Sequence, residues 1–212
     1  MNAGQHDERL GTVRLGPDAV IDREALVGYL SPRRGVSDLL EIGPGARIRS
    51  GSVIYAGSKI GARLETGHNV VIREQNTIGE RFSIWNNSVV DYGCTIGDNV
   101  KIHCNIYIAQ FTVIEDDVFM APGVTIANDI HPGCPQSGEC MRGPVLRRGC
   151  RLGVNVTVVP YVTIGEGTLV GSGSVVTRDL PPGVLAYGNP ARVHARLEEL
   201  ACKTGRRKAP YA

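Results

Sequence analysis

The histidines are the side chains of this sequence best suited to moving a proton near neutral pH, because an unperturbed imidazole has a pKa of about 6.5. Five are present, and one of them, His131, precedes Pro132 and follows the polar pair Asn128 and Asp129. A catalytic base must reach the proton that it removes, and a neighbouring polar group often orients it. The grouping predicts His131 as a general base, with Asn128 and Asp129 orienting the imidazole or a bound substrate. The alternative is a loop histidine without a chemical role.

The same segment contains two thiols, which allow a second chemistry. Cys134 and Cys140 follow His131 within the loop. Cysteine and histidine are common zinc ligands, although this spacing is looser than in common zinc motifs and a fourth ligand would come from elsewhere. A zinc ion would make His131 a ligand and remove it as a base. The sequence leaves both alternatives open.

A period of six residues reveals the elements that must position this segment. Among the fifteen positions from Ile42 to Ile126, only Thr66 is not hydrophobic. Neither the helical period of 3.6 nor the strand period of 2 produces this spacing, so the repeat is interpreted first. The positions, with a fainter prelude and a later resumption, are Leu15, Ile21, Val27, Ile42, Ile48, Ile54, Ile60, Thr66, Ile72, Ile78, Ile84, Val90, Ile96, Ile102, Ile108, Ile114, Met120, Ile126, Leu146, Leu152, Val158, Ile164, Val170 and Val176.

A second inward position follows four residues after each aliphatic one and usually holds a small or β-branched residue, such as Ala46 or Val70. Three short strands joined by turns close a triangular coil of about 18 residues, and successive coils stack with their strands about 4.8 Å apart. We therefore predict an all-β fold, a parallel β-helix of hexapeptide repeats over residues 15–189, after an N-terminal segment at 1–14. Cys94 and Cys150 fall in inward positions and are expected to be buried.

Three interruptions break the period. Residues 29–38 form an insertion near the N-terminal end, and residues 128–145 form a long loop of the kind that commonly carries function. Residues 190–212 are expected to form a short C-terminal helix and a basic tail, because Val193, Leu197 and Leu200 recur at helical spacing. Such a helix would cover the open edge of the last coil.

Residues 18 positions apart should lie above one another, and this groups several polar side chains. Glu74, Tyr92, Gln110 and Asn128 form one such column, which predicts the lining of a substrate pocket that ends at the loop. Arg73 should lie under an aspartate of the next coil and form an ion pair, or grip a substrate phosphate. A solvated face is the alternative for the whole column.

Two further histidines are candidates for substrate contact. His103 should stack on Trp85, and His68 should lie beneath Asn86. Both fall at outward corners on one side of the predicted prism, where a substrate or a neighbouring subunit would reach them. Ordinary polar corner residues are the alternative.

Composition excludes several classes of partner. A formal net charge of +2 does not favour nucleic acid or a membrane surface, and no apolar run is long enough to span a bilayer. Residues 1–16 are too polar for a signal peptide. The six cysteines are expected to stay reduced in a cytoplasmic protein, and His6 and His194 are expected to be solvated.

Several motifs carry a resemblance to a known family: IGDNVKI at 96–102, IEDDVF at 114–119, NDIHP at 128–132, and the ending GSGSVVTRDLPP at 171–182 with GNPAR at 188–192. They resemble the hexapeptide-repeat acyltransferases, and the ending is the strongest match. TGHNVVIRE at 66–74, with the Asn128-Asp129 pair, is similar to the branch that acylates amino groups of nucleotide-linked sugars. The resemblance covers roughly residues 42–193.

The resemblance implies a left-handed helix and a homotrimer that binds an acyl-CoA between neighbouring prisms. It implies direct transfer of an acyl group from acetyl-CoA to an amino sugar, without a required metal. Slim corners in the last coils would admit the pantetheine arm, and arginines would pair with the phosphates. The residues expected to bind the co-substrate are Gly153, Gly171, Ser172, Arg178, Asn189 and Arg192.

One residue departs from the nucleotide-sugar branch and keeps other functions open. The position of His131 is often aromatic in that branch, whereas a catalytic His-Pro is typical of acetyltransferases for simple sugars and antibiotics. O-acetylation of a simple sugar or other small hydroxyl compound is therefore the first alternative. Alternatives from other classes are a γ-type carbonic anhydrase-like metalloenzyme, although the required pair of histidines five residues apart does not occur, and a non-catalytic assembly module.

Overall fold

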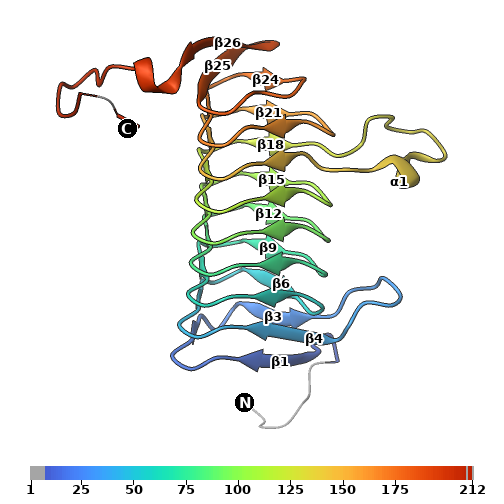
Figure 1. Cartoon of the computed structure of the whole chain (residues 1–212). Coiled ribbons are helices and arrows are strands. Elements are labelled where there is room, and N and C mark those ends of the chain that lie inside the picture. The colour runs from blue at the N-terminus through green and yellow to red at the C-terminus, as the bar shows by residue number, and fades with distance from the viewer. Residues whose placement is uncertain (1–7, 209, 212) are drawn as a thin grey trace.

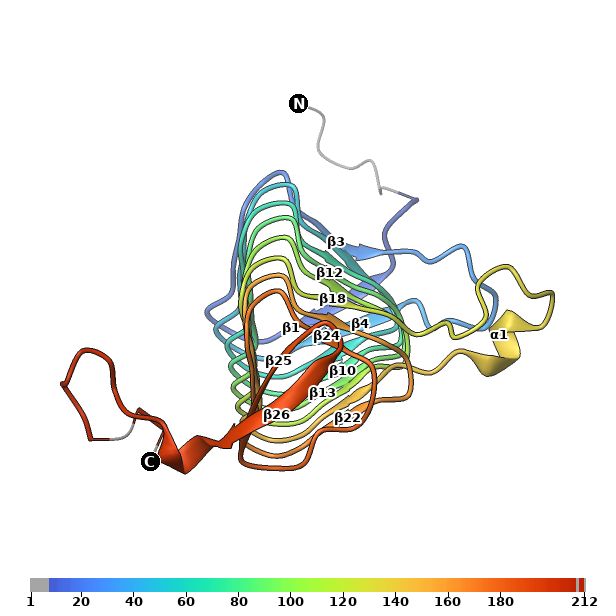
Figure 2. The same ribbon diagram turned by 90° about the horizontal axis from the view of Figure 1, so that it is seen from above.

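The structure, a computed structural model, describes residues 8–208 and 210–211 of the 212-residue chain. Short strands coil into a triangular prism whose three faces are parallel sheets (Figures 1 and 2). The architecture is a left-handed parallel β-helix of hexapeptide repeats, so the predicted fold is confirmed.

In each coil the chain passes from the first sheet to the second and then to the third. The first sheet contains β1 (Thr12–Leu15), β4 (Leu39–Ile42), β7 (Lys59–Ile60), β10 (Thr77–Ile78), β13 (Thr95–Ile96), β16 (Val113–Ile114), β19 (Val145–Leu146) and β22 (Thr163–Ile164). The second contains β2 (Val20–Ile21), β5 (Arg47–Ile48), β8 (Glu65–Thr66), β11 (Ser83–Ile84), β14 (Lys101–Ile102), β17 (Phe119–Met120), β20 (Arg151–Leu152), β23 (Leu169–Val170), β25 (Val184–Gly188) and β26 (Ala191–Arg196). The third contains β3 (Leu26–Tyr29), β6 (Val53–Tyr55), β9 (Val71–Ile72), β12 (Val89–Val90), β15 (Tyr107–Ile108), β18 (Thr125–Ile126), β21 (Thr157–Val158) and β24 (Val175–Val176).

The strand register places the aliphatic residues of the six-residue period above one another. Ile78 in β10 pairs with Ile96 in β13, and Ile84 in β11 pairs with Ile102 in β14. These four side chains are at most 3% exposed. The predicted stacking of residues 18 positions apart is therefore confirmed.

The second inward position is less uniform than the sequence pattern indicates. Phe82, Leu64 and Ile106 occupy it and are at most 1% exposed, whereas Ser88 occupies it elsewhere and is also fully buried. The Ser88 hydroxyl donates to the carbonyl oxygen of His103 at 2.8 Å and accepts from the Ile106 amide at 3.1 Å. A buried hydroxyl is tolerated in this core because both of its hydrogen-bonding functions are used.

The three corners of the prism are named in chain order: the first joins the first and second sheets, the second joins the second and third, and the third joins the third and first. Tight corners require left-handed backbone, which asparagine tolerates better than most residues. At the second corner Asn69, Asn87 and Asn105 have φ of 57°, 58° and 58°. Their side-chain amides form a ladder along this corner, with Nδ2–Oδ1 distances of 3.3 Å and 3.4 Å.

Both large insertions leave the prism at the third corner (Figures 1 and 2). Residues 30–38, the lower insertion, connect β3 to β4. Residues 127–144, the upper insertion, connect β18 to β19 and contain α1 (Ser137–Cys140), the single α-helix of the described residues. After the second insertion the register is restored, since Leu146 pairs with Ile114. The two insertions therefore flank the outer side of one corner from below and from above.

The C-terminal segment corrects one prediction. Residues 191–201 do not form an α-helix: Ala191–Arg196 is strand β26, which pairs antiparallel with β25, and only Leu197–Glu199 forms a short 3-10 helix. The last coil exposes a row of unpaired backbone groups, and a strand satisfies them directly. The predicted covering of the open end is present, but a hairpin supplies it.

His194 is exposed in β26, and His6 lies outside the described residues. In the described part of the chain, no helix is long and apolar enough to cross a membrane.

Candidate functional site

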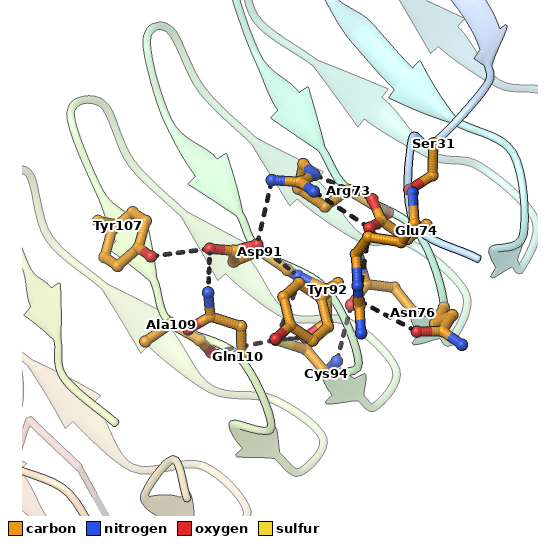
Figure 3. A network of polar contacts seen from close by, with 12 residues as sticks. Ser31, Arg73, Glu74, Asn76, Asp91, Tyr92, Cys94, Tyr107, Ala109 and Gln110 are labelled. Carbon is orange, nitrogen blue, oxygen red and sulfur yellow. Dashed lines mark hydrogen bonds and ion pairs between the residues drawn. The ribbon is translucent and has the colours of Figure 1, made fainter. Parts of the chain in front are cut away.

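The third corner gathers the polar column that the sequence predicts. Glu74, Tyr92, Gln110 and Asn128 follow β9, β12, β15 and β18 at equivalent positions, with Asn128 at the root of the upper insertion. Arg33 reaches this column from the lower insertion. The column thus connects the two insertions (Figure 3 shows its lower and middle parts).

Glu74 is the most buried charged residue of this corner, with its side chain fully excluded from solvent. Arg73 donates from Nε and Nη2 to its two carboxylate oxygens at 2.9 Å and 3.1 Å, and Arg33 Nη1 lies 3.4 Å from Oε1. Burial alone would raise the pKa of Glu74, but the hydrogen bonds from Arg73 and Ser31, a backbone hydrogen bond and the Arg73 charge together hold that pKa below its ordinary value. The hydrogen bond to Glu74 in turn raises the pKa of Arg73. Glu74 is therefore a charged anchor for both arginines.

The lowered pKa of Glu74 predicts a specific dependence of stability on pH. A carboxyl group with a lowered folded-state pKa stabilises the fold above its unfolded pKa, and this contribution is lost as pH falls through the folded pKa. We expect Glu74→Gln to lower the melting temperature at neutral pH, and the difference from the unsubstituted protein to shrink as pH falls below the ordinary value of 4.5. Thermal unfolding followed by circular dichroism over a pH series measures this, with the exposed Glu166→Gln as control. A difference that does not vary with pH would show that Glu74 acts by packing alone.

Asp91 organises the middle of the corner and is 7% exposed. Its Oδ2 accepts hydrogen bonds from the Tyr107 hydroxyl at 2.8 Å and from Gln110 Nε2 at 2.7 Å (Figure 3). Arg73 Nη1 lies 3.7 Å from Oδ1, so the predicted ion pair between coils is confirmed. Burial and the contact with Asp91 raise the pKa of Tyr107 to about 12, which keeps its hydroxyl protonated and donating.

Aromatic rings line the outer side of the same corner. The Arg33 guanidinium lies 3.5 Å from the centre of the Tyr92 ring, and that of Arg73 lies 5.0 Å from the Tyr55 ring. Phe111 meets Tyr92 edge to face with ring centres 5.4 Å apart. Rings and guanidinium groups together form a surface suited to a polar ligand with flat or anionic parts.

The upper insertion is held firmly where it leaves the prism. The Arg142 amide donates to the carbonyl oxygen of Asn128 at 2.9 Å, and the Tyr161 hydroxyl donates to the carbonyl oxygen of Cys140. A side chain at Gly143 would meet Thr112 backbone and side-chain atoms at about 2.5 Å, so only glycine allows this close approach. The backbone at Asn128 is therefore held in place.

His131 lies three residues beyond Asn128, and its side chain is exposed. Asp129 Oδ1 accepts a hydrogen bond from the backbone amide of His131 at 2.8 Å, and Asn128 Nδ2 donates to Gln110 Oε1 at 2.6 Å. Among the hydrogen bonds of the described residues, none joins Asn128 or Asp129 to the imidazole. Asp129 shapes the turn that carries His131, while Asn128 belongs to the corner network.

His68 and His103 lie at the second corner, on the other edge of the third sheet, and are not brought to the polar column within one chain. His68 Nδ1 pairs with the Ser50 hydroxyl at 2.8 Å, and its amide donates to Asn86 at 3.1 Å. His103 packs edge to face on Phe119 with ring centres 5.2 Å apart. Partial burial lowers the pKa of His103, and the charge of Lys101 lowers it further.

The residues expected to bind acyl-CoA are spread over the last coils and the terminal hairpin. Gly153, Gly171 and Ser172 lie at the second corner, whereas Arg178 is exposed at the third. An added side chain at Gly153 would meet the Ser172 amide nitrogen at 2.6 Å, so stacking between coils already requires this glycine. The remaining two, Asn189 and Arg192, are exposed in the hairpin turn and in β26.

The four cysteines of the inward positions and of the upper insertion differ in burial. Cys94 and Cys150 are at most 1% exposed, as predicted, and burial raises the pKa of each thiol to about 12. Cys134 is exposed and Cys140 is half-buried. Within residues 8–208 and 210–211, no group of three His, Cys, Asp or Glu side chains is arranged to hold a metal ion.

Sequence reasoning missed two residues of the network. Arg33 sits in the lower insertion, for which the sequence predicts no role. This insertion follows β3 in the same way that Glu74 follows β9, so both lie at the third corner. That shared position was the available signal. Tyr107 points outward from β15 and reaches Asp91 one coil away, a contact that 18-residue stacking does not predict.

Comparisons with known proteins agree with the repeat. Residues 93–128 match the family described as bacterial transferase hexapeptide (six repeats). The chain is 37% identical over 91 residues to galactoside O-acetyltransferase of Escherichia coli (strain K12), covering 41% of this chain and 45% of that protein. It is 32% identical over 106 residues to galactoside O-acetyltransferase of Lactococcus lactis subsp. lactis (strain IL1403), covering 45% and 51%.

The chain spans about half the length of these curated relatives. Among solved structures, UDP-N-acetylglucosamine acyltransferase from Campylobacter jejuni has a TM-score of 0.52 at 18% identity, over 86% of this chain and 75% of that one. A likeness at this identity concerns the fold. Residues 93–128 therefore match the hexapeptide repeat of bacterial transferases, and the prism as a whole resembles the fold of this solved structure.

Proposed function

We propose that this protein is an acetyltransferase that moves the acetyl group of acetyl-CoA directly to a sugar, with the amino group of a nucleotide-linked sugar as the first candidate acceptor. The observation that carries the proposal is the third corner, where a histidine-bearing loop rises from a fixed polar network. The similarity of the chain to galactoside O-acetyltransferases supports acetyl transfer as the reaction class.

In the proposed reaction the acceptor nitrogen attacks the thioester carbonyl carbon. The new carbon–nitrogen bond forms as the carbon–sulfur bond breaks, and the electron pair of that bond leaves with the CoA sulfur. His131 removes one proton from the attacking amine and returns it to the sulfur, so the products are an N-acetyl sugar and CoA thiol. A hydrogen-bond donor must hold the developing oxyanion, and the acetyl-CoA would place its carbonyl where a backbone amide can serve.

The binding residues are assigned to two groups. Arg73, Glu74, Tyr92 and Gln110 face or support the acceptor, with the two arginine–aromatic contacts suited to a nucleotide phosphate and base. The acetyl-CoA is assigned to the last coils, where Gly153, Gly171 and Ser172 form a slim corner and Arg178, Asn189 and Arg192 offer exposed polar groups.

A homotrimer in the cytoplasm completes the proposal. In such a trimer a neighbouring prism would bring its second corner, with His68 and His103, toward the third corner of this chain. This arrangement would unite the two groups of candidate residues, which lie at separate corners within one chain. Its test is the mass in solution, by light scattering coupled to size exclusion.

A hydroxyl acceptor on a simple sugar is the second candidate. The specific observations that favour it are the two galactoside O-acetyltransferases among the relatives and His131 before Pro132. The chemistry is the same except that the new bond is an ester.

The deciding experiment measures loss of the acetyl-CoA thioester absorbance, which does not count the chain's own six cysteines. The panel contains amino-sugar nucleotides, the same nucleotides with a hydroxyl in place of the amine, and simple galactosides. Turnover confined to amino-sugar nucleotides supports the first candidate, and turnover with galactosides supports the second. No turnover with any acceptor, together with no thermal stabilisation by acetyl-CoA, would exclude an acetyltransferase; a ligand at 100 times its Kd adds about 2.7 kcal/mol of stability.

A further inference from the structure

The side chains of Asp91, Gln110 and Asn128 form a hydrogen-bonded relay at the third corner. The direction of its hydrogen bonds follows from elementary chemistry. An ionised carboxylate has no hydrogen to donate, so every polar group that faces Asp91 must donate to it. Tyr107 and Gln110 both do so at Oδ2, at 2.8 Å and 2.7 Å, and the Tyr92 amide does so at Oδ1, at 2.8 Å.

The carboxylate therefore fixes the side-chain amide of Gln110. Its nitrogen faces Asp91, which leaves Oε1 facing Asn128, 2.6 Å from Nδ2. Oε1 must receive a hydrogen, so Asn128 turns its nitrogen inward and its oxygen outward. Reversing either amide would put two oxygens or two nitrogens in contact. The oxygen and nitrogen of an amide have similar shapes, so the hydrogen-bond partners determine the orientation of both amides.

The outward atom, Asn128 Oδ1, is available to a ligand. Every buried side-chain nitrogen and oxygen in the described residues has a hydrogen-bond partner. Oδ1 accepts a hydrogen bond from none of these residues, so this atom is not fully buried, although Asn128 as a whole is only 8% exposed. The bond from the Arg142 amide to the Asn128 carbonyl holds the backbone beneath it.

We propose that Asp91 and Gln110 are positioning residues that present Asn128 Oδ1 to the acceptor, where it accepts a hydrogen bond from the attacking amine or hydroxyl. This inference rests on the proposed function and assigns the acceptor end of the site to Asn128. In this role Asn128 orients the nucleophile's lone pair toward the thioester carbon. It does not stabilise the oxyanion, because an oxyanion requires a donor.

The test transfers the negative charge from position 91 to position 128, the two ends of the relay. Asn128→Asp keeps an outward oxygen but sets a carboxylate against Gln110 Oε1, and we expect kcat/KM for the acceptor to fall about 30-fold. In the double variant Asp91→Asn/Asn128→Asp the Gln110 amide can reverse, so that it accepts from the new amide nitrogen at position 91 and donates to the new carboxylate at position 128. The Tyr107 hydroxyl, which donates to Asp91 Oδ2, can rotate to accept the second hydrogen of the new amide nitrogen. We expect this double variant to recover to within about 3-fold of the unsubstituted protein.

The matched control is Asn99→Asp, which removes a comparable Nδ2 donor, 2.7 Å from Asp117 Oδ1, at an exposed first-corner position. It should leave kcat/KM unchanged. Melting temperatures of the relay variants provide a readout independent of activity, since the double variant should also recover the stability that Asn128→Asp loses. Recovery of stability without recovery of kcat/KM would overturn the proposal, because the relay would then be structural only.

Failure of the relay is distinguishable from failure of the proposed function. If the unsubstituted protein acetylates an acceptor and the double variant stays as impaired as Asn128→Asp, the relay is wrong while the acetyltransferase stands. If the unsubstituted protein acetylates nothing, both are wrong.

Discussion

Replacing His131 with alanine is expected to lower kcat by about 10²- to 10⁴-fold, the range in which general-base catalysis contributes. In the proposed reaction the acceptor must lose a proton as it attacks the thioester, and His131 is the imidazole that the upper insertion carries, three residues beyond Asn128. Because the His131 side chain is exposed, its loss should change the free energy of unfolding by no more than about 0.5 kcal/mol. Steady-state kinetics on the best acceptor, with a melting curve for the same preparation, measures both.

Gln136→Ala is the matched control, because Gln136 is exposed in the same insertion and its side chain makes no capping hydrogen bond to α1. It should retain full activity. An His131→Ala variant that turns over within 3-fold of the unsubstituted protein, a limit of about 0.6 kcal/mol, would remove His131 as the base. The role would then pass to His103, to His68 or to the substrate itself.

The six-residue period was sufficient to predict the prism and its register, because inward slots of a thin core leave few alternatives. A side chain such as Ile84 can be buried only if Ile102 lies directly above it, and the strands pair in that way. The same logic placed Arg73 beside Asp91 and Asn128 above Gln110. Periodicity therefore reaches the polar corners as well as the core.

In the C-terminal hairpin, the need to pair the backbone groups of the last coil outweighs the helical spacing of the local sequence. Val193, Leu197 and Leu200 have helical spacing, yet Val193 is 48% exposed in β26 and Leu197 alone of the three is buried. The last coil leaves backbone donors and acceptors without partners, a demand that no local sequence window reveals. An edge that must be paired selects the strand.

The candidate site was only partly predictable, for a related reason. The column Glu74, Tyr92, Gln110, Asn128 follows from stacking, but the direction of its hydrogen bonds depends on Asp91, whose partners Arg73, Tyr107 and Gln110 come from neighbouring coils. Arg33 joins only because the lower insertion folds up along the corner to reach Glu74. Such contacts depend on side-chain reach and loop path, which spacing does not encode.

Replacing Phe82 with alanine should cost about 3–5 kcal/mol of unfolding free energy, the largest effect expected from a single core substitution here. The ring is fully buried, in an inward slot where Leu64 lies one coil below and Val100 one coil above. The coils cannot collapse to fill the space, because backbone hydrogen bonds of 2.9 Å from Glu65 to Phe82 and 3.0 Å from Ser83 to Val100 fix their spacing. The cavity would therefore remain open and the cost should lie at the upper end.

Phe111→Ala is the control, since that ring is 40% exposed and contributes mainly an edge contact with Tyr92, worth about 1 kcal/mol. Denaturant unfolding followed by two probes measures both variants and reveals any loss of cooperativity between coils. Equal costs for the two substitutions would contradict the argument, because they would mean that the prism relaxes around a missing ring. A rigid stack is also what the site requires: if the coils around Phe82 could shift freely, the 2.6 Å contact between Gln110 and Asn128 could not be held in register either.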